Sequence, residues 1–163
     1  MARIAIFGAT GFVGTALSLK LLDLGHEVVA LSRHPERWPL QHKNLRTIRG
    51  DIMNQHAVNE VLESVECAYY LVHGLDVEAE DFEFQEAKGA TCFARAAKRA
   101  KLKKVIYLGG LGPEAELSAH LRSRHLVGEI LSLSSAACVE FRASIVLGAQ
   151  STSFEMIKAL AHR

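Results

Sequence analysis

The sequence has almost no excess charge of either sign. Its 19 lysines and arginines stand against 18 aspartates and glutamates, which gives a formal net charge of +1. A surface built to bind nucleic acid carries a clear excess of positive charge. We therefore predict that nucleic acid is not a partner. Apolar residues make up 49% of the chain and charged residues 23%, which is the balance of a globular protein.

Long hydrophobic runs are absent, and cysteine is scarce. No stretch approaches the roughly 20 apolar residues of a membrane span, and the apolar run after Arg3 is too short for the core of a secretion signal. The three cysteines, Cys67, Cys92 and Cys138, are odd in number and do not have the spacing of a zinc site. We expect reduced, buried thiols, no membrane span, no metal site and a cytoplasmic protein.

Proline is also rare, with three residues, and the chain has no repeat, low-complexity tract or linker. A length of 163 residues suits one domain with a full core. We therefore predict a single domain over residues 1–163.

Short strand-like runs alternate with longer amphipathic stretches along the whole chain. The predicted strands are 3–7, 27–31, 45–48, 67–72, 104–109 and 139–145. The predicted helices are 12–24, 54–64, 81–101, 117–133 and 152–162. Gly25 is a good residue to end the first helix, and Asn54 a good one to begin the second. This alternation predicts an α/β fold with a doubly wound parallel sheet, in the strand order 3-2-1-4-5-6.

A glycine-rich turn joins the first strand to the first helix, in the form Gly8-Ala9-Thr10-Gly11-Phe12-Val13-Gly14. Gly8 permits the tight turn, Gly11 lets the backbone approach a pyrophosphate, and Gly14 allows close packing of the helix on the strand. The helix start offers free N–H groups and the positive end of its dipole to phosphate, and Thr10 can add a hydroxyl donor. We predict a Rossmann-type site that binds a dinucleotide through Gly8, Thr10, Gly11, Phe12, Val13 and Gly14.

The end of the second strand selects the cofactor. NAD-dependent enzymes usually place an acidic residue here to bind the ribose 2′-hydroxyl, whereas this chain has Ser32 and Arg33. A guanidinium can bind a 2′-phosphate bidentately. We therefore predict that NADP(H) is preferred and that NAD(H) is also accepted. The alternative is a solvated Arg33 in a protein that tolerates both cofactors.

Three further strand ends should meet the cofactor. After the third strand, Asp51 and Ile52 could cover the adenine, although Asp51 could equally start the next helix. After the fourth strand, we expect backbone contacts to the central ribose and pyrophosphate, and we interpret His73 as a crevice residue rather than a metal ligand. The residues predicted at these ends are Asp51, Ile52, Val72, His73, Gly74 and Gly109.

The motifs GATGFVG, SRHPER, GDI, AYYLVHGL, VIYLGGLG, LSAHLRSRHLVGEIL and EFRASIVLGAQSTSFEMI resemble the atypical short-chain dehydrogenase/reductases. More narrowly, the chain is similar to the NmrA-like, NAD(P)H-binding proteins often labelled nucleoside-diphosphate-sugar epimerases. The resemblance covers essentially the whole chain. It implies a Rossmann fold, a bound NAD(P)(H), and one of two functions. Some members are reductases or epimerase-like enzymes, whereas others bind the cofactor as redox sensors without turnover.

The chain departs from the catalytic pattern of the wider superfamily. That pattern has a Ser at the end of the fifth strand and a Tyr-x-x-x-Lys on the next helix. Here the corresponding register holds His120 and Arg124. Residues four apart share a helical face, so His120 could exchange a proton and Arg124 could bind ribose hydroxyls. The alternative is a polar helix face with no catalytic role.

In these families, chain beyond the sixth strand builds most of the substrate pocket. The sequence provides only a short helix there and ends at Arg163, so we expect a minimal C-terminal substrate region. A partner subunit or a second copy would then complete the pocket for an unidentified small-molecule substrate. We predict an NADP(H)-dependent oxidoreductase or epimerase-like enzyme with non-standard catalytic residues. The alternative is a non-catalytic NADP(H)-binding redox sensor or regulatory module.

Overall fold

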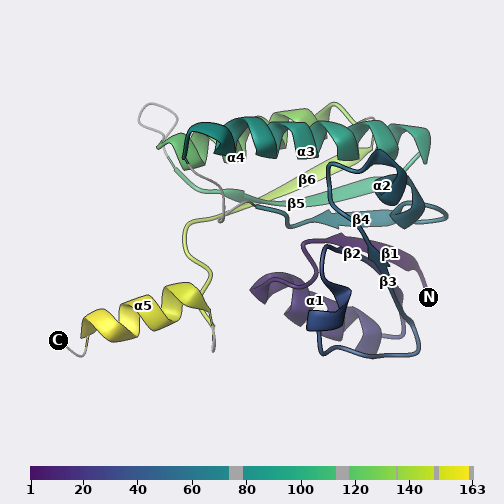
Figure 1. The fold of residues 1–163 in the computed structure, drawn as a ribbon, viewed down its shortest axis with the longest axis horizontal. Helices are drawn as coiled ribbons and strands as arrows, with labels where there is room; N and C mark the ends of the chain where they lie inside the picture. The colour runs from purple at the N-terminus through teal and green to yellow at the C-terminus, as the bar shows by residue number, and fades with distance from the viewer. Residues whose placement is uncertain (74–78, 113–117, 135, 149–150, 162–163) are drawn as a thin grey trace.

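A six-stranded parallel sheet forms the centre of the molecule (Figure 1). The computed structural model describes residues 1–73, 79–112, 118–134, 136–148 and 151–161. The strands are β1 (Arg3–Phe7), β2 (Glu27–Ser32), β3 (Leu45–Arg49), β4 (Cys67–Tyr70), β5 (Lys104–Gly110) and β6 (Ala137–Ala143). Their order in the sheet is β3-β2-β1-β4-β5-β6, which confirms the predicted Rossmann-type topology.

The helices are α1 (Phe12–Asp23), α2 (Gln55–Val61), α3 (Ala79–Arg99), α4 (Ala119–Ser132) and α5 (Thr152–Ala161). Both predicted helix ends are confirmed. Gly25 follows the α1 C-cap with a φ of 80°, the left-handed conformation that favours glycine. Asn54 caps α2, because its side chain accepts hydrogen bonds from the backbone N–H groups of His56 and Ala57.

Two strands differ from the sequence prediction by two residues at an end. β6 covers Ala137–Ala143 rather than 139–145, because its register with β5 pairs Ala137 with Lys104 and fixes both ends. β4 ends at Tyr70, two residues before the predicted end at 72. A 3-10 turn, η1 (Pro35–Arg37), with proline in its first turn, lies between β2 and β3, where no element was predicted.

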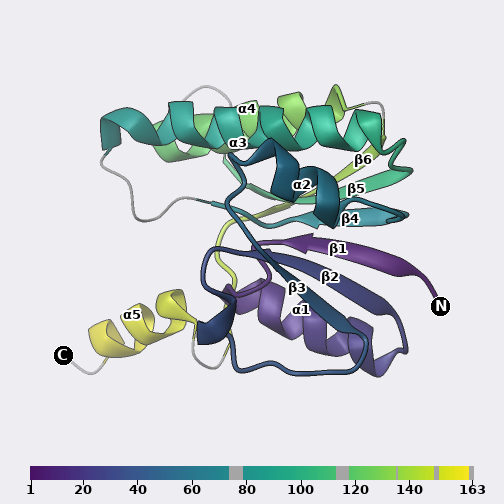
Figure 2. The ribbon, with the colours of Figure 1, turned by 45° about the vertical axis from the view of Figure 1, so that its right-hand side comes forward.

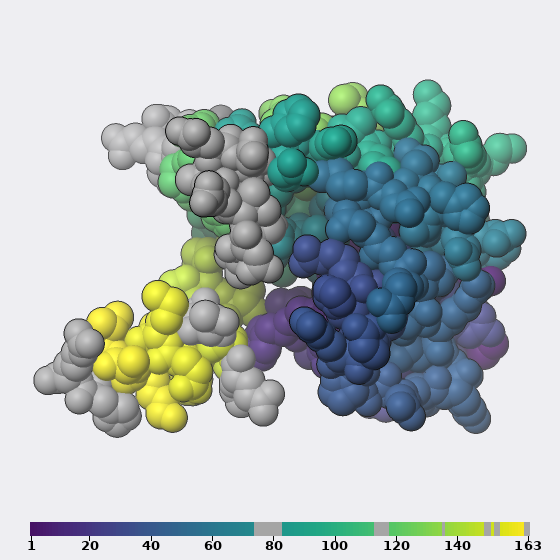
Figure 3. All heavy atoms as spheres, viewed as in Figure 1, coloured from purple at the N-terminus to yellow at the C-terminus, as the bar shows by residue number. Residues whose placement is uncertain are grey.

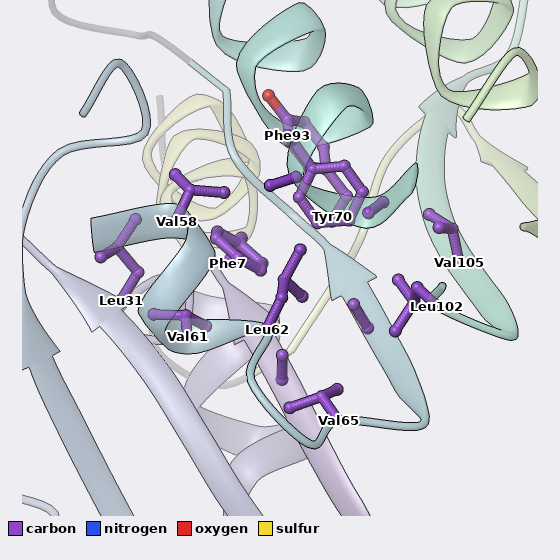
Figure 4. Packing of buried hydrophobic residues seen from close by; sticks show 14 of the residues in the cluster. Phe7, Leu31, Val58, Val61, Leu62, Val65, Tyr70, Phe93, Leu102 and Val105 are labelled. Atoms are coloured by element: carbon purple, nitrogen blue, oxygen red, sulfur yellow. The ribbon is translucent and has the colours of Figure 1, made fainter. Parts of the chain in front are cut away.

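The sheet separates two apolar clusters. On one face α2, α3 and α4 cover the sheet, and on the other face α1 packs against β1 and β2 together with Trp38 (Figures 1 and 2). Figure 4 shows Phe7, Tyr70 and Phe93 together in the larger cluster. The Phe93 ring lies 4.9 Å from that of Phe7 and 5.1 Å from that of Tyr70, both edge to face. Each such pair adds about 1 kcal/mol to the stability that burial provides.

The β6 side of the sheet is less well covered. Val139 and Phe141 on β6 are 41% and 61% exposed. In Figures 1 to 3 the yellow helix α5 stands off the sheet at one end of the molecule, and Phe154, Ile157 and Leu160 on it are exposed. The result is an apolar surface on β6 and α5.

Candidate functional site

A crevice of about 530 Å³ opens at the carboxyl ends of β1, β2, β3 and β4 and is bounded by the start of α3. This is where ligands bind in open α/β sheets, because the strand order reverses there. The predicted residues that line it are Gly8, Thr10, Gly11, Ser32, Arg33, Asp51, Ile52, Val72 and His73. Those that do not line it are Phe12, Val13, Gly14, Gly109, His120 and Arg124. Gly74 lies outside the described residues.

The three glycines of the first turn meet different surroundings. Gly8 has a φ of 86°, and a Cβ there would lie 2.7 Å from the Leu71 carbonyl group. A Cβ on Gly14 would collide with the carbonyl oxygen of Gly8 and with the backbone of Ala9. A Cβ on Gly11 would meet only the Gly8 oxygen, at 3.3 Å, because this residue faces the crevice. The turn is therefore closed on the protein side and open on the crevice side.

The start of α1 suits an anion. Gly11 is the N-cap, no side chain caps the helix, and its first turn contains no acidic residue. The N–H groups of the first turn of a helix have no partner within the helix, and the helix dipole places positive charge beside them. Such an end is a ready site for the phosphates of a dinucleotide. The residues present therefore fit a pyrophosphate.

Basic side chains gather where β2 ends. Ser32 is buried, and its Oγ accepts a hydrogen bond of 3.2 Å from the His34 N–H. Arg33 follows it and lines the crevice as an exposed residue. The acid nearest in sequence, Glu36, forms an ion pair with Arg49 at 2.8 Å. The end of β2 therefore offers a guanidinium to the crevice.

Asp51 orders the turn after β3. Its Oδ1 accepts a hydrogen bond of 2.8 Å from the Met53 N–H, whereas the N-cap of α2 is Asn54. Asn54 therefore starts the helix, and Asp51 lines the crevice. His73 follows β4 and also lines the crevice. Neighbouring protein atoms desolvate the imidazole and Arg124 repels its charged form, so the pKa of His73 lies below its ordinary value.

Arg124 is turned into the protein rather than into the crevice. It is 6% exposed, and its guanidinium donates to the carbonyl oxygens of Leu108 and, at 3.5 Å, of Val72. Its own carbonyl oxygen accepts a 2.9 Å hydrogen bond from the Tyr107 hydroxyl. Arg124 thus joins the carboxyl ends of β4 and β5. His120, one turn earlier on α4, is exposed.

Eight residues that line the crevice were not among the predicted site residues: Leu31, Gly50, Met53, Tyr70, Leu71, Gln85, Glu86 and Gly89. Glu86 is 8% exposed and accepts a 2.6 Å hydrogen bond from the Ser123 hydroxyl. Burial, and then the Glu86 carboxylate, raise the pKa of Tyr70, so its phenol stays protonated. Gln85 and Glu86 lie in the first half of α3, which carries several other charged residues, so the sequence pattern did not distinguish this wall.

We expect Arg124→Leu to lower the stability of the fold by more than it weakens cofactor binding. The substitution removes charge-assisted donors from two carbonyl groups, a loss of about 2–3 kcal/mol, or roughly 5–10 °C in melting temperature. The matched variant His120→Ala changes an exposed residue and should stay within about 0.5 kcal/mol of the parent. Calorimetric melts of both variants measure this. Equal melting temperatures for Arg124→Leu and the parent would contradict the structural role.

Within the described parts of the chain, no helix is long and apolar enough to cross a membrane. In the same residues, no three or more histidine, cysteine or acidic side chains are grouped as metal ligands.

A doubly wound parallel sheet, with a glycine turn at a crevice where the strand order reverses, defines the class of dinucleotide-binding Rossmann proteins. The chain belongs to the NAD(P)H-binding family, whose model matches residues 8–145. This confirms the predicted membership of an NAD(P)H-binding family.

Relatives with assigned activities are similar to parts of the chain. A dihydroflavonol 4-reductase of Gerbera hybrida is 26% identical over 125 residues, which are 68% of this chain and 34% of the relative. A 3-beta-hydroxysteroid dehydrogenase of Mycolicibacterium neoaurum is 32% identical over 77 residues, 47% of this chain and 21% of the relative. The chain thus spans about a third of the length of the first of these relatives.

Solved structures share the fold. The Bordetella bronchiseptica enzyme WbmH, in complex with NAD+, has a TM-score of 0.82 and 17% identity, covering 99% of this chain and 63% of that one. A UDP-glucose 4-epimerase of Thermotoga maritima has a TM-score of 0.72 and 15% identity, and the match covers 86% of this chain and 54% of that one. At these identities the likeness establishes the fold alone, which agrees with the Rossmann-type sheet.

Proposed function

We propose that the chain holds NADP(H) in the crevice and acts as an oxidoreductase or epimerase-like protein of the short-chain dehydrogenase/reductase type. One observation carries the proposal: an open glycine, an uncapped helix start and an exposed arginine surround a single crevice. Gly11 and the first N–H groups of α1 bind the pyrophosphate in this proposal. Arg33 binds the 2′-phosphate, and NAD(H) binds in the same place more weakly.

The other strand ends hold the remaining parts of the cofactor. Asp51 and Ile52 lie at the adenine, and the backbone of Val72 and His73 lies along the central ribose. The nicotinamide supplies hydride chemistry when the cofactor is bound. His120 would exchange the proton. Arg124 supports the crevice from behind, since it holds the Val72 and Leu108 carbonyls in place.

A second function is favoured by one observation. The guanidinium that stands in for the catalytic lysine is buried against two carbonyl groups and does not line the crevice. A protein without that group at its nicotinamide end can still bind cofactor. The second candidate is therefore a non-catalytic NADP(H)-binding sensor that reports cofactor state to a partner.

One experiment tests binding and separates the two functions. Thermal melts with NADPH, NADP, NADH and NAD should show larger stabilisation by the phosphorylated pair. NADPH oxidation is then followed with a panel of carbonyl substrates. Oxidation above the rate of the buffer supports the enzyme, and stabilisation without any oxidation supports the sensor. A melting temperature that no dinucleotide changes would contradict both.

We further propose that residues 1–163 form one cytoplasmic domain, whose thiols stay reduced. We also propose that a second copy or a partner subunit covers the apolar surface on β6 and α5. Exposed side chains such as Phe141 and Ile157 support this, because large apolar patches usually mark an interface. Catalysis needs the substrate held against the nicotinamide with water excluded.

We therefore expect the isolated 163-residue chain to bind cofactor with micromolar affinity and to oxidise NADPH slowly or not at all. Light scattering gives the oligomeric state of the preparation whose turnover is measured. Rapid turnover of a simple carbonyl or quinone by a monomer would contradict this expectation, because the substrate half would then be complete in one chain.

A further inference from the structure

A second guanidinium lies beside Arg33 at the end of β2. The register of the parallel strands pairs Arg49 on β3 with Ser32 on β2. The Arg49 Nη1 donates to the backbone carbonyl oxygen of Arg33 at 3.5 Å. The next residue along the chain, Gly50, lines the crevice together with Ser32 and Arg33. Arg49 therefore stands at the border of the proposed 2′-phosphate position.

The side chain of Arg49 lies on the α1 side of the sheet. Alternate residues of β2, Val28 and Ala30, pack in the cluster that contains α1, and Ser32 continues this alternation. Paired residues of neighbouring strands present their side chains to the same face, so Arg49 shares the face of Ser32. The preceding residue, Ile48, packs in the cluster on the opposite face. Arg49 is thus on the same side as the glycine turn.

Glu36 forms an ion pair with this guanidinium. Its Oε2 lies 2.8 Å from the Arg49 Nη2, and its Oε1 lies 3.4 Å from the His34 Nδ1. A backbone hydrogen bond and the charge of Arg49 keep the pKa of Glu36 below its ordinary value, so the carboxylate is ionised at neutral pH. The side chains of Arg49 and Glu36 are 64% and 53% exposed. Exposed ion pairs of this kind are weak and readily exchanged.

We propose that Arg49 is a second ligand of the adenosine 2′-phosphate, and that the phosphate displaces Glu36 from it on binding. This inference rests on the proposed function. The chemistry favours the exchange, because a phosphate monoester carries about −1.5 to −2 charges at pH 7 whereas a carboxylate carries one. Arginine also binds phosphate through two parallel N–H···O bonds. Glu36 then acts as a competitor that sets the strength of NADP(H) discrimination.

The test compares two nucleotides that differ only in this phosphate: adenosine 2′,5′-bisphosphate and adenosine 5′-monophosphate. Calorimetric dissociation constants are measured for the parent, Arg49→Gln, Glu36→Gln and the control Arg46→Gln. Arg46 lies on the same strand and pairs with Glu60 at 2.6 Å, with 53% of its side chain exposed. Arg46 contacts α2, on the other face of the sheet. Arg46→Gln therefore removes the same charge as Arg49→Gln but leaves the end of β2 unchanged.

We expect the parent to prefer the bisphosphate by tenfold or more. Arg49→Gln should weaken the bisphosphate about three- to tenfold and leave the monophosphate within twofold. Glu36→Gln should tighten the bisphosphate about two- to fivefold, because the competing carboxylate is gone. Arg46→Gln should match the parent for both nucleotides, and melting temperatures of all variants confirm that the fold is kept.

Three results would overturn the inference in distinguishable ways. If the parent binds both nucleotides equally, the 2′-phosphate site of the proposed function fails and Arg49 loses its role with it. If the parent discriminates and Arg49→Gln behaves like Arg46→Gln, only the role of Arg49 fails. If Glu36→Gln binds the bisphosphate no more tightly than the parent, the displacement of Glu36 is wrong.

Discussion

Gly11→Val should abolish stabilisation by NADPH while leaving the unliganded protein folded. The φ of Gly11 is −73° and its ψ 174°, values that any residue adopts, and a Cβ would meet only the Gly8 carbonyl oxygen, at 3.3 Å. The new side chain instead enters the space that we assign to the pyrophosphate. At a ligand concentration about 100 times Kd, the parent gains roughly 2.7 kcal/mol, or about 5–10 °C in melting temperature. The variant should lose this shift.

Two companion variants make the result specific. Gly11→Ala places a smaller group at the same point and should lose part of the shift. Gly14→Ala should instead destabilise the unliganded protein by about 1–3 kcal/mol, because its Cβ collides with the backbone of Gly8 and Ala9. The full NADPH shift in Gly11→Val would show that the dinucleotide binds elsewhere.

Arg33→Asp should reverse the preference between NADPH and NADH. Losing a charge-assisted contact to the 2′-phosphate costs about 1.5–3 kcal/mol, or roughly ten- to a hundredfold in affinity for NADPH. The new carboxylate can accept a hydrogen bond from the 2′-hydroxyl of NADH, as an acid at this strand end does in NAD-dependent proteins. The measurement is the pair of dissociation constants for each variant.

Arg37→Asp provides the control for net charge. This substitution changes the net charge by the same amount as Arg33→Asp. Arg37 lies four residues further along the chain, in η1, and does not line the crevice. We expect the NADPH:NADH affinity ratio to change less than about threefold there, since long-range effects of one exposed charge are screened by salt. A parent-like ratio in Arg33→Asp would remove Arg33 from the site.

The fold was predictable because it depends on local patterns. Short apolar runs between amphipathic stretches predicted every strand of the sheet and its order, and Gly25 and Asn54 marked helix ends correctly. Strand ends were less predictable. β6 begins at Ala137 because β5 lies beside it, and that pairing is not encoded in the β6 sequence itself.

The site was predictable only where the backbone makes it. The glycine turn and the β2 end follow from chain direction, so Gly8, Gly11 and Arg33 could be placed at one crevice from the sequence. Side-chain partners that come from distant parts of the chain could not be predicted in this way. The register with Tyr-x-x-x-Lys placed Arg124 on the correct helix, but the carbonyls of Val72 and Leu108, 52 and 16 residues away, bind its guanidinium. Glu86 was missed because only tertiary packing brings the start of α3 to the crevice.

A crystal structure of the NADPH complex tests the central claim most directly. We predict that the pyrophosphate lies over the N–H groups that follow Gly11, at the start of α1, and that the 2′-phosphate lies beside Arg33. We also predict that His120 lies on the nicotinamide side and that Arg124 remains bound to the Val72 and Leu108 carbonyls. A dinucleotide bound outside this crevice, or a 2′-phosphate turned away from Arg33 into solvent, would contradict the central claim.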